Sequence, residues 1–183
     1  GLFTLVRVGI PGVMPGFGDA NGPRRSWQLA AFVRSLTRDG GATVAGNVAG
    51  GRAVYQKRGC ANCHVLAGEG RAIGPDLSAI GLQRGAAYLR QALVEPGASV
   101  PDGHVVVTAR PKSGDAVRGV RLSEDAFWVH VRDVKGQLHT FRVAELAELT
   151  REAGASLMPA YASLPPTELD DLVAYLSSLR GQR

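Results

Sequence analysis

Apolar residues recur at helical spacing in three segments of this 183-residue chain. Behind Pro165-Pro166, the last segment carries a stripe of residues three and four apart, namely Leu169, Leu172, Val173, Leu176 and Leu179. This spacing predicts an amphipathic helix with Thr167 as its N-cap. Residues 48–58 and 84–94 are predicted as two further helices. Gly59 is expected to end the first of these, because glycine readily adopts the left-handed conformation that stops a helix.

The first and last of these helices are expected to cross. Gly51 and Tyr55 lie four residues apart and therefore share one helix face. A glycine on that face allows a second backbone to approach closely, and Tyr175 on the last helix would then pack beside Tyr55.

Between residues 104 and 143 the pattern changes to an alternation of apolar and polar residues. Strands of a small antiparallel sheet are predicted over four ranges: residues 104–110, 116–122, 126–132 and 138–143. In the third strand Phe127, Val129 and Val131 share one face, and Trp128, His130 and Arg132 share the other.

The first 40 residues repeat a pattern found near the end of the chain. Val13-Met14-Pro15-Gly16-Phe17 matches Leu157-Met158-Pro159-Ala160-Tyr161, and residues 27–36 match residues 170–179. The two-part match indicates that residues 1–40 are the second half of a domain whose complete copy follows. A coincidental pair of helices is the alternative. The Gly-rich residues 39–46 are predicted to be a linker.

Composition limits the function classes. The hydrophobic fraction of 45% allows a substantial core, in one to one and a half domains. The net charge of +5 is spread thinly, without the basic cluster that a nucleic-acid-binding face requires. No apolar run approaches the length of a membrane span. Gly1–Ile10 is apolar but short and is interrupted by Arg7, so we expect a mature or trimmed form of an exported protein.

The most specific motif is Cys60-Ala61-Asn62-Cys63-His64. C-x-x-C-H is the attachment site of a c-type haem. The two cysteines reach the vinyl groups of one porphyrin as thioethers, and the histidine binds the iron from below. The motif predicts one covalent haem c per chain.

Other uses of two cysteines fit less well. A thioredoxin-like dithiol needs a βαβ context, which the flanking residues do not provide. A structural zinc site needs two more ligands at suitable spacing, and the sequence has no other cysteine. A disulfide across two intervening residues would be strained and would close almost no loop.

Met158 is the favoured sixth ligand of the iron. It precedes Pro159, which holds the local backbone in a stiff loop outside any helical stripe. His104, His130 and His139 are rival ligands, although each is also explained as a polar position on a half-exposed strand. An open sixth position is the remaining alternative.

Taken together, these motifs resemble a class I cytochrome c: Gly51 and Tyr55, Cys60-Ala61-Asn62-Cys63-His64, Gly74-Pro75-Asp76-Leu77, Met158-Pro159 and the last helix. The resemblance covers about residues 45–183. It implies a mainly α fold, with a partial domain at residues 1–40, a cytochrome c domain at residues 41–183, and a small antiparallel β insertion at about 104–143. The insertion resembles haem-binding modules joined to large bacterial dehydrogenase-like proteins. It is expected to cover one side of the haem, and a docking surface with Trp128 as a contact is the alternative.

The resemblance also assigns haem-binding roles. His64 and Met158 would bind the iron, and the carbonyl of Pro75 would accept a hydrogen bond from the imidazole of His64. The other expected haem contacts are Cys60, Cys63, Gly74, Leu77, Tyr161 and Arg71. Arg71 would pair with a haem propionate, although a solvated loop arginine explains it equally well.

The expected function is electron transfer in the periplasm or another exported location, between a dehydrogenase donor and an oxidase or cytochrome acceptor. With both axial positions filled, the iron changes oxidation state without binding substrate. The alternatives are a haem enzyme or gas sensor with a labile sixth ligand, and a module that only tethers or regulates a fused enzyme. The large apolar residues of 1–40 are expected to pack either on the complete domain or on another chain, and the second case would give a homodimer through this segment.

The motif makes a direct prediction about mass. The mature protein should have the mass of the polypeptide plus one haem, and it should stain for haem on a denaturing gel. Replacing Cys60 or Cys63 by alanine should leave one thioether and a poor yield of holoprotein. An intact mass equal to that of the bare polypeptide would exclude covalent haem.

Overall fold

The computed structural model describes residues 1–38 and 44–181 and divides the chain into two compact units. The first unit comprises residues up to 43 and the second begins at Val44. The predicted linker, residues 39–46, lies mostly outside the described residues. None of the helices within the described ranges is long and apolar enough to cross a membrane.

The first unit consists of α1 (Leu2–Val8) and α2 (Gly18–Arg38). Gly22 has a φ of 62°, and Pro23 follows it, so α2 is interrupted at this point and restarts at Pro23. Phe3 of α1 stacks on Trp27 of α2 with 4.4 Å between ring centroids. Ser26 is fully buried between the helices, and its hydroxyl donates to the carbonyl of Gly22 at 2.8 Å.

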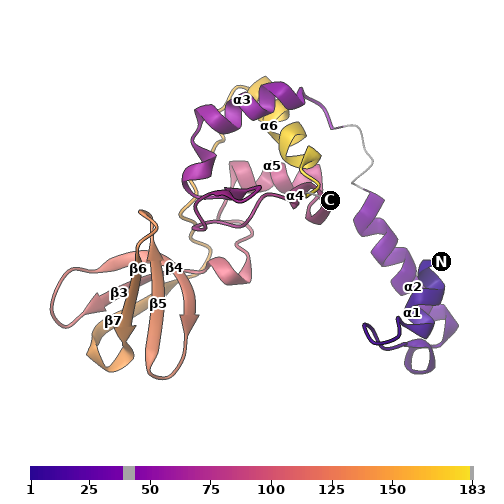
Figure 1. Ribbon diagram of the computed structural model, residues 1–183, viewed down its shortest axis with the longest axis horizontal. Helices are drawn as coiled ribbons and strands as arrows, with labels where there is room; N and C mark the ends of the chain where they lie inside the picture. Colours follow the sequence, from indigo (N-terminus) through magenta and orange to yellow (C-terminus); the bar gives the residue numbers. More distant parts are fainter. Residues whose placement is uncertain (39–43, 182–183) are drawn as a thin grey trace. The chain divides into compact units, whose positions relative to one another are not determined.

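The second unit has a helical part and a sheet (Figure 1). Its α-helices are α3 (Val48–Lys57), α4 (Ile80–Gln83), α5 (Ala86–Val94) and α6 (Pro166–Ser178). Two short strands, β1 (Val65–Leu66) and β2 (Glu69–Gly70), form a small ribbon, and the 3-10 turns are η2 (Cys60–Asn62), η3 (Asp102–His104) and η4 (Val143–Glu145).

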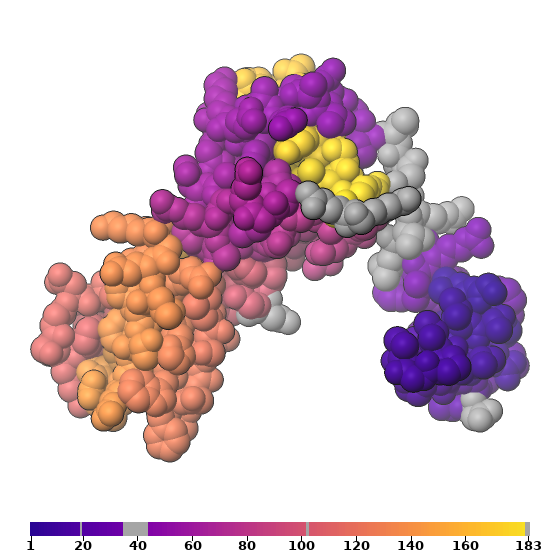
Figure 2. Space-filling model, viewed as in Figure 1, coloured from indigo at the N-terminus to yellow at the C-terminus, as the bar shows by residue number. Residues whose placement is uncertain are grey.

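The sheet is antiparallel throughout, with the strand order β6-β5-β4-β3-β7. Its strands are β3 (Val106–Pro111), β4 (Val117–Glu124), β5 (Trp128–Asp133), β6 (Leu138–Arg142) and β7 (Leu146–Glu152). Its own core is formed by Val107, Ala109, Val129 and Val131, all without exposed surface. The sheet therefore forms a lobe beside the helical part (Figure 2).

The crossing of α3 and α6 follows the prediction. A Cβ at Gly51 would collide with the main-chain carbonyl of Asp171, so only glycine permits this approach. Tyr55 and Tyr175 meet edge to face with 5.6 Å between ring centroids. Most of the predicted apolar stripe is buried in the helical core, where Leu172 is 1% exposed, whereas Leu179 follows the end of α6 and is only partly buried.

Several predicted details are wrong. The described residues contain six α-helices and a five-stranded sheet, so the fold is mixed rather than mainly α. The sheet extends past residue 143, because Leu146–Glu152 pairs with β3 as a fifth strand. Thr167 lies inside α6, which begins at Pro166 with Pro165 as its N-cap.

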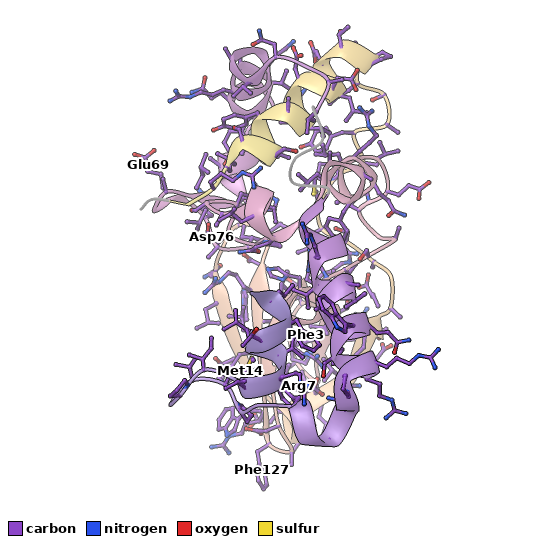
Figure 3. The ribbon with its side chains drawn as sticks, turned by 90° about the vertical axis from the view of Figure 1, so that its right-hand side faces the viewer. Phe3, Arg7, Met14, Glu69, Asp76 and Phe127 are labelled. Atoms are coloured by element: carbon purple, nitrogen blue, oxygen red, sulfur yellow. The ribbon has the colours of Figure 1, made fainter. Side chains whose placement is uncertain are left out.

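Two side chains of the predicted strands also lie elsewhere. His104 belongs to η3, before the sheet begins. Phe127 precedes β5, is 73% exposed and projects from the end of the sheet (Figure 3). Asp125 holds this turn, because its carboxylate accepts from the amides of Phe127 and Trp128.

The crossing of α3 and α6 yields a stability prediction. Gly51→Ala should reduce the free energy of unfolding by about 1–3 kcal/mol or more, because the added methyl overpacks a backbone contact. Gly103→Ala is the control, since its Cβ would meet no atom within 4 Å. Denaturant unfolding measures both, and equal stabilities would contradict the proposed role of Gly51.

Candidate functional site

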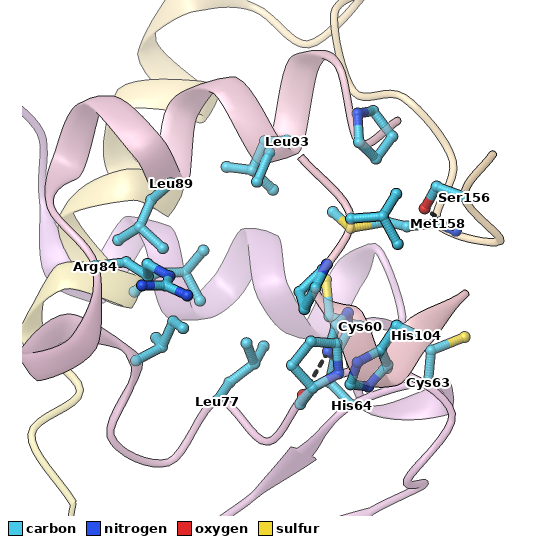
Figure 4. Close-up of a pocket in the computed structure, with 18 of the residues that line it drawn as sticks. Cys60, Cys63, His64, Leu77, Arg84, Leu89, Leu93, His104, Ser156 and Met158 are labelled. Carbon is cyan, nitrogen blue, oxygen red and sulfur yellow. Dashed lines mark hydrogen bonds between the residues drawn. The ribbon is translucent and has the colours of Figure 1, made fainter. Parts of the chain in front are cut away.

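The Cys60–His64 motif is presented by a tight turn at the end of α3. Arg58 ends the helix, and Gly59 then adopts a left-handed conformation with a φ of 65°. The amides of Cys63 and His64 both donate to the carbonyl of Cys60, at 3.1 and 3.0 Å. This turn brings Cys60, Cys63 and His64 to the wall of one cavity (Figure 4).

His64 is oriented by a main-chain acceptor. Its Nδ1 lies 2.8 Å from the carbonyl oxygen of Pro75. A carbonyl only accepts, so Nδ1 must carry the proton, and the lone pair of Nε2 is then available to a metal. Burial lowers the pKa of His64, although the hydrogen bond to Pro75 opposes this effect. The ring is therefore suited to the neutral, metal-binding form.

The loop before Pro75 is closely fitted to the histidine ring. The amides of Ile73 and Gly74 both donate to the carbonyl of Cys63, at 3.0 and 2.7 Å. A Cβ at Gly74 would lie 2.5 Å from Cε1 of His64, so the loop can approach the ring only because this residue is glycine. The amide of Arg71 also donates to the carbonyl of Ala61 at 3.1 Å, so main-chain hydrogen bonds fix the loop to the motif.

Met158 lines the same cavity from the loop before α6. Its amide donates to the hydroxyl of Ser156 at 3.1 Å, and its side chain packs against the helical core. Figure 4 shows Met158 and His64 on different sides of the cavity. The structure therefore brings together two groups that are 94 positions apart in the chain.

The cavity has a volume of about 260 Å³ and a largely apolar wall. α3, α5 and α6 contribute its main aliphatic and aromatic side chains, which are Tyr55, Leu89, Leu93, Leu172 and Leu176. Two polar atoms in this wall, Oη of Tyr55 and Nδ1 of His104, are buried without a hydrogen-bond partner. Burial, together with Cys60 and Tyr175, raises the pKa of Tyr55 to about 12.

These residues fit a large, apolar, metal-bearing cofactor. Two thiols and one imidazole with a free Nε2 lie at one wall, and a thioether lies at another. The unpartnered polar atoms are available to polar groups of a ligand. By contrast, the described ranges contain no group of three or more His, Cys, Asp or Glu side chains that could hold a metal ion by themselves.

Most of the predicted haem contacts line this cavity. These are Cys60, Cys63, His64, Gly74, Pro75, Leu77 and Met158. Arg71 lies outside the lining, and its Nη1 donates to the carbonyl of Lys135 at 3.1 Å. Tyr161 also lies outside it. Tyr161 packs against the helical core, and its amide donates to the carbonyl of Leu93 at 2.8 Å.

The three rival histidines lie in different places in the structure. Nδ1 of His130 lies 2.9 Å from Oγ1 of Thr140, and Nε2 of His139 lies 3.0 Å from a carboxylate oxygen of Asp133, both on the sheet. Neither lines the cavity, whereas His104 does. Burial lowers the pKa of His104, although an interaction with the main chain of Gly74 opposes this effect.

Many lining residues were not expected from the sequence, among them Arg84, Tyr88, Ser156 and Val120. Arg84 and Tyr88 form a pair in which the guanidinium lies 4.9 Å from the ring centroid. Ser156 precedes the methionine loop, and Val120 comes from β4. The Ser-x-Met-Pro spacing could have indicated Ser156, since serine commonly accepts from an amide two residues ahead. No local signal identifies Val120.

Residues 48–131 match the model of a family described as Cytochrome c. The match covers just under half of the chain, including α3, the Cys60–His64 motif and the Pro75 loop. It ends within β5, before Met158. No curated protein matches the chain. The family match supports a c-type cytochrome, and a cytochrome c domain implies covalently bound haem c.

Proposed function

We propose that this chain is an electron-transfer protein that carries one haem c, bound through Cys60 and Cys63 and ligated by His64 and Met158. The observation that carries the proposal is that Cys60, Cys63 and His64 line one apolar cavity together with the distant Met158. The bound iron would carry one electron by changing between its ferric and ferrous states.

The chain's own residues would supply binding, orientation and shielding. Pro75 holds the Nδ1 proton of His64 and so directs Nε2 toward the cavity. Leu89, Leu93, Leu172 and Leu176 exclude water from the wall. An apolar environment of this kind disfavours the more highly charged ferric state, and a thioether ligand acts in the same direction. Both effects suit a protein that accepts electrons.

We also propose an exported location, the periplasm in a bacterium, because thioether attachment of haem takes place there after secretion. The partners would be other redox proteins, a dehydrogenase as donor and an oxidase or cytochrome as acceptor. Contact with them would be brief, and the exposed positive charges would not form a clustered nucleic-acid face.

Axial ligation is tested by substitution. Met158→Ala should abolish the weak long-wavelength absorption band of Met–Fe³⁺ and lower the reduction potential, because a thioether favours the ferrous state. Met14→Ala is the matched control, since Met14 also precedes a proline but belongs to the first unit. A five-coordinate spectrum of the unmodified protein would instead favour a haem enzyme or gas sensor. Loss of the band in Met14→Ala would refute the assignment.

We further propose that residues 1–40 are the second half of another cytochrome c domain and make a packing contact. α2 restarts at Pro23, as α6 begins at Pro166, and each restart follows a Met-Pro loop. In the matched helices, Leu29 corresponds to Leu172 and Val33 to Leu176. Leu172 and Leu176 are 1% and 6% exposed, whereas Leu29 and Val33 are 40% and 38% exposed. Leu29 and Val33 therefore form an open part of this face on α2, although Ser26 and Ala30, which match Leu169 and Val173, are buried.

This open face predicts self-association. Apolar surface left in water is unfavourable by about 25 cal/mol per Å², so a second copy should cover it and form a homodimer. Light scattering should show a dimer for the full chain and a monomer after removal of residues 1–40.

A paired substitution refines this test. Leu29→Asp should weaken the dimer, whereas Val134→Asp, at an exposed turn of the sheet, should leave it unchanged. A monomeric full chain with an unchanged haem spectrum would rule out the dimer.

A further inference from the structure

Two arginines join the sheet to the loop that follows the Cys60–His64 motif. Nη1 of Arg132, in β5, donates to the carbonyl of Ala72 at 2.5 Å. In the opposite direction, Nη1 of Arg71 donates to the carbonyl of Lys135, in the turn between β5 and β6, at 3.1 Å. Each part of the unit thus supplies one guanidinium to a main-chain carbonyl of the other.

The carbonyl held by Arg132 belongs to the loop that orients His64. Ala72 directly precedes Ile73 and Gly74, whose amides donate to the carbonyl of Cys63. Pro75 then accepts the hydrogen bond from His64 at 2.8 Å. The loop from Ala72 to Pro75 is therefore held on one side by the motif and on the other by the sheet.

The main chain of Arg132 is held within the sheet. Arg132 is half-buried and lies opposite Val120 in the sheet, and Val120 is 4% exposed and lines the cavity. Gly119 has no side chain to separate β4 from the carbonyl of Arg132, so the two strands approach closely at this point. The sheet thus presents the guanidinium from a rigid position.

We propose that Arg132 is a positioning residue for the proximal side of the haem. By holding Ala72, it keeps the Pro75 carbonyl within hydrogen-bond distance of His64. This inference rests on the proposed ligation of the haem iron by His64. A firm hydrogen bond from Nδ1–H makes the imidazole a more basic ligand, and a more basic ligand favours the ferric state. The inserted sheet therefore helps to set the reduction potential.

The full-length holoprotein with Arg132→Met tests the proposal, because two explanations predict opposite signs. Loss of positioning weakens the bond between Pro75 and His64, so the reduction potential should rise. If Arg132 acted only through its positive charge, its removal would stabilise the ferric state, and the reduction potential should fall. Proton NMR should also show faster solvent exchange of the His64 Nδ1–H in Arg132→Met. Arg132→Lys keeps both charge and donor and should restore most of the potential.

Arg110→Met is the matched control. Arg110 is an exposed arginine of the same sheet whose Nε lies 3.8 Å from a carboxylate oxygen of Glu148. If Arg132→Met lowers the potential, or behaves like Arg110→Met with unchanged Nδ1–H exchange, the inference is overturned. A wild-type protein without His–iron ligation would instead overturn the proposed function. If the Arg132→Met holoprotein cannot be produced, Arg71→Met is the second variant. It removes the bond from Arg71 to the carbonyl of Lys135 and should also raise the reduction potential.

Discussion

The close crossing of α3 and α6 at Gly51 is the contact on which the rest of the site depends. It brings Leu172 and Leu176 of α6 to the cavity and places the end of α3, from which the Cys60–His64 turn continues, beside them. Burial of the apolar α6 face dominates this contact, at roughly 1.5–3 kcal/mol for each large aliphatic side chain. The ion pairs of Lys57 and Arg58 with Glu168 lie at the exposed edge and add little. Polar contacts help to align α3 with α6. The side chain of Asn47 caps α3, and the main-chain amide of Asn47 donates to the carboxylate of Asp171 at 2.6 Å.

The inserted sheet is physically part of the cavity rather than a separate appendage. It has a buried core of its own, formed by Val107, Ala109, Val129 and Val131. Val120 in β4, with His104 just before β3, lines the cavity. The reciprocal bonds of Arg71 and Arg132 join the sheet to the loop beside the cavity. A rigid body attached at the proximal loop can restrain the histidine without contacting it. If His64 ligates the haem iron as proposed, the insertion would affect the electronic properties of the iron through this loop.

The parts of the site that were predicted correctly depend on local patterns. Gly59, the Cys60–His64 turn and the contact of Gly51 with α6 follow from short motifs or helical spacing. The hydrogen bond from His64 to Pro75 was implied by the resemblance to class I cytochromes c. The errors occur where tertiary contacts override local preference. Leu146–Glu152 has leucines three apart among good helix formers, yet it is a strand because β3 offers an open edge. Phe127 continues an alternating run, yet it lies in the turn held by Asp125, and β5 starts only at Trp128.

The sequence by itself determined the chemistry of this protein: two thiols and an imidazole at haem-attachment spacing, a methionine on a proline-stiffened loop, and amphipathic segments able to enclose an apolar ligand. Such properties are local, because they follow from residue type and from separations of a few positions. Only the tertiary structure decided which of four histidines reach the cavity, that Arg71 turns to Lys135, and that the sheet holds the proximal loop through Arg132. Those outcomes depend on contacts between residues about 60 positions apart, and no periodic pattern in the chain specifies how two such segments meet.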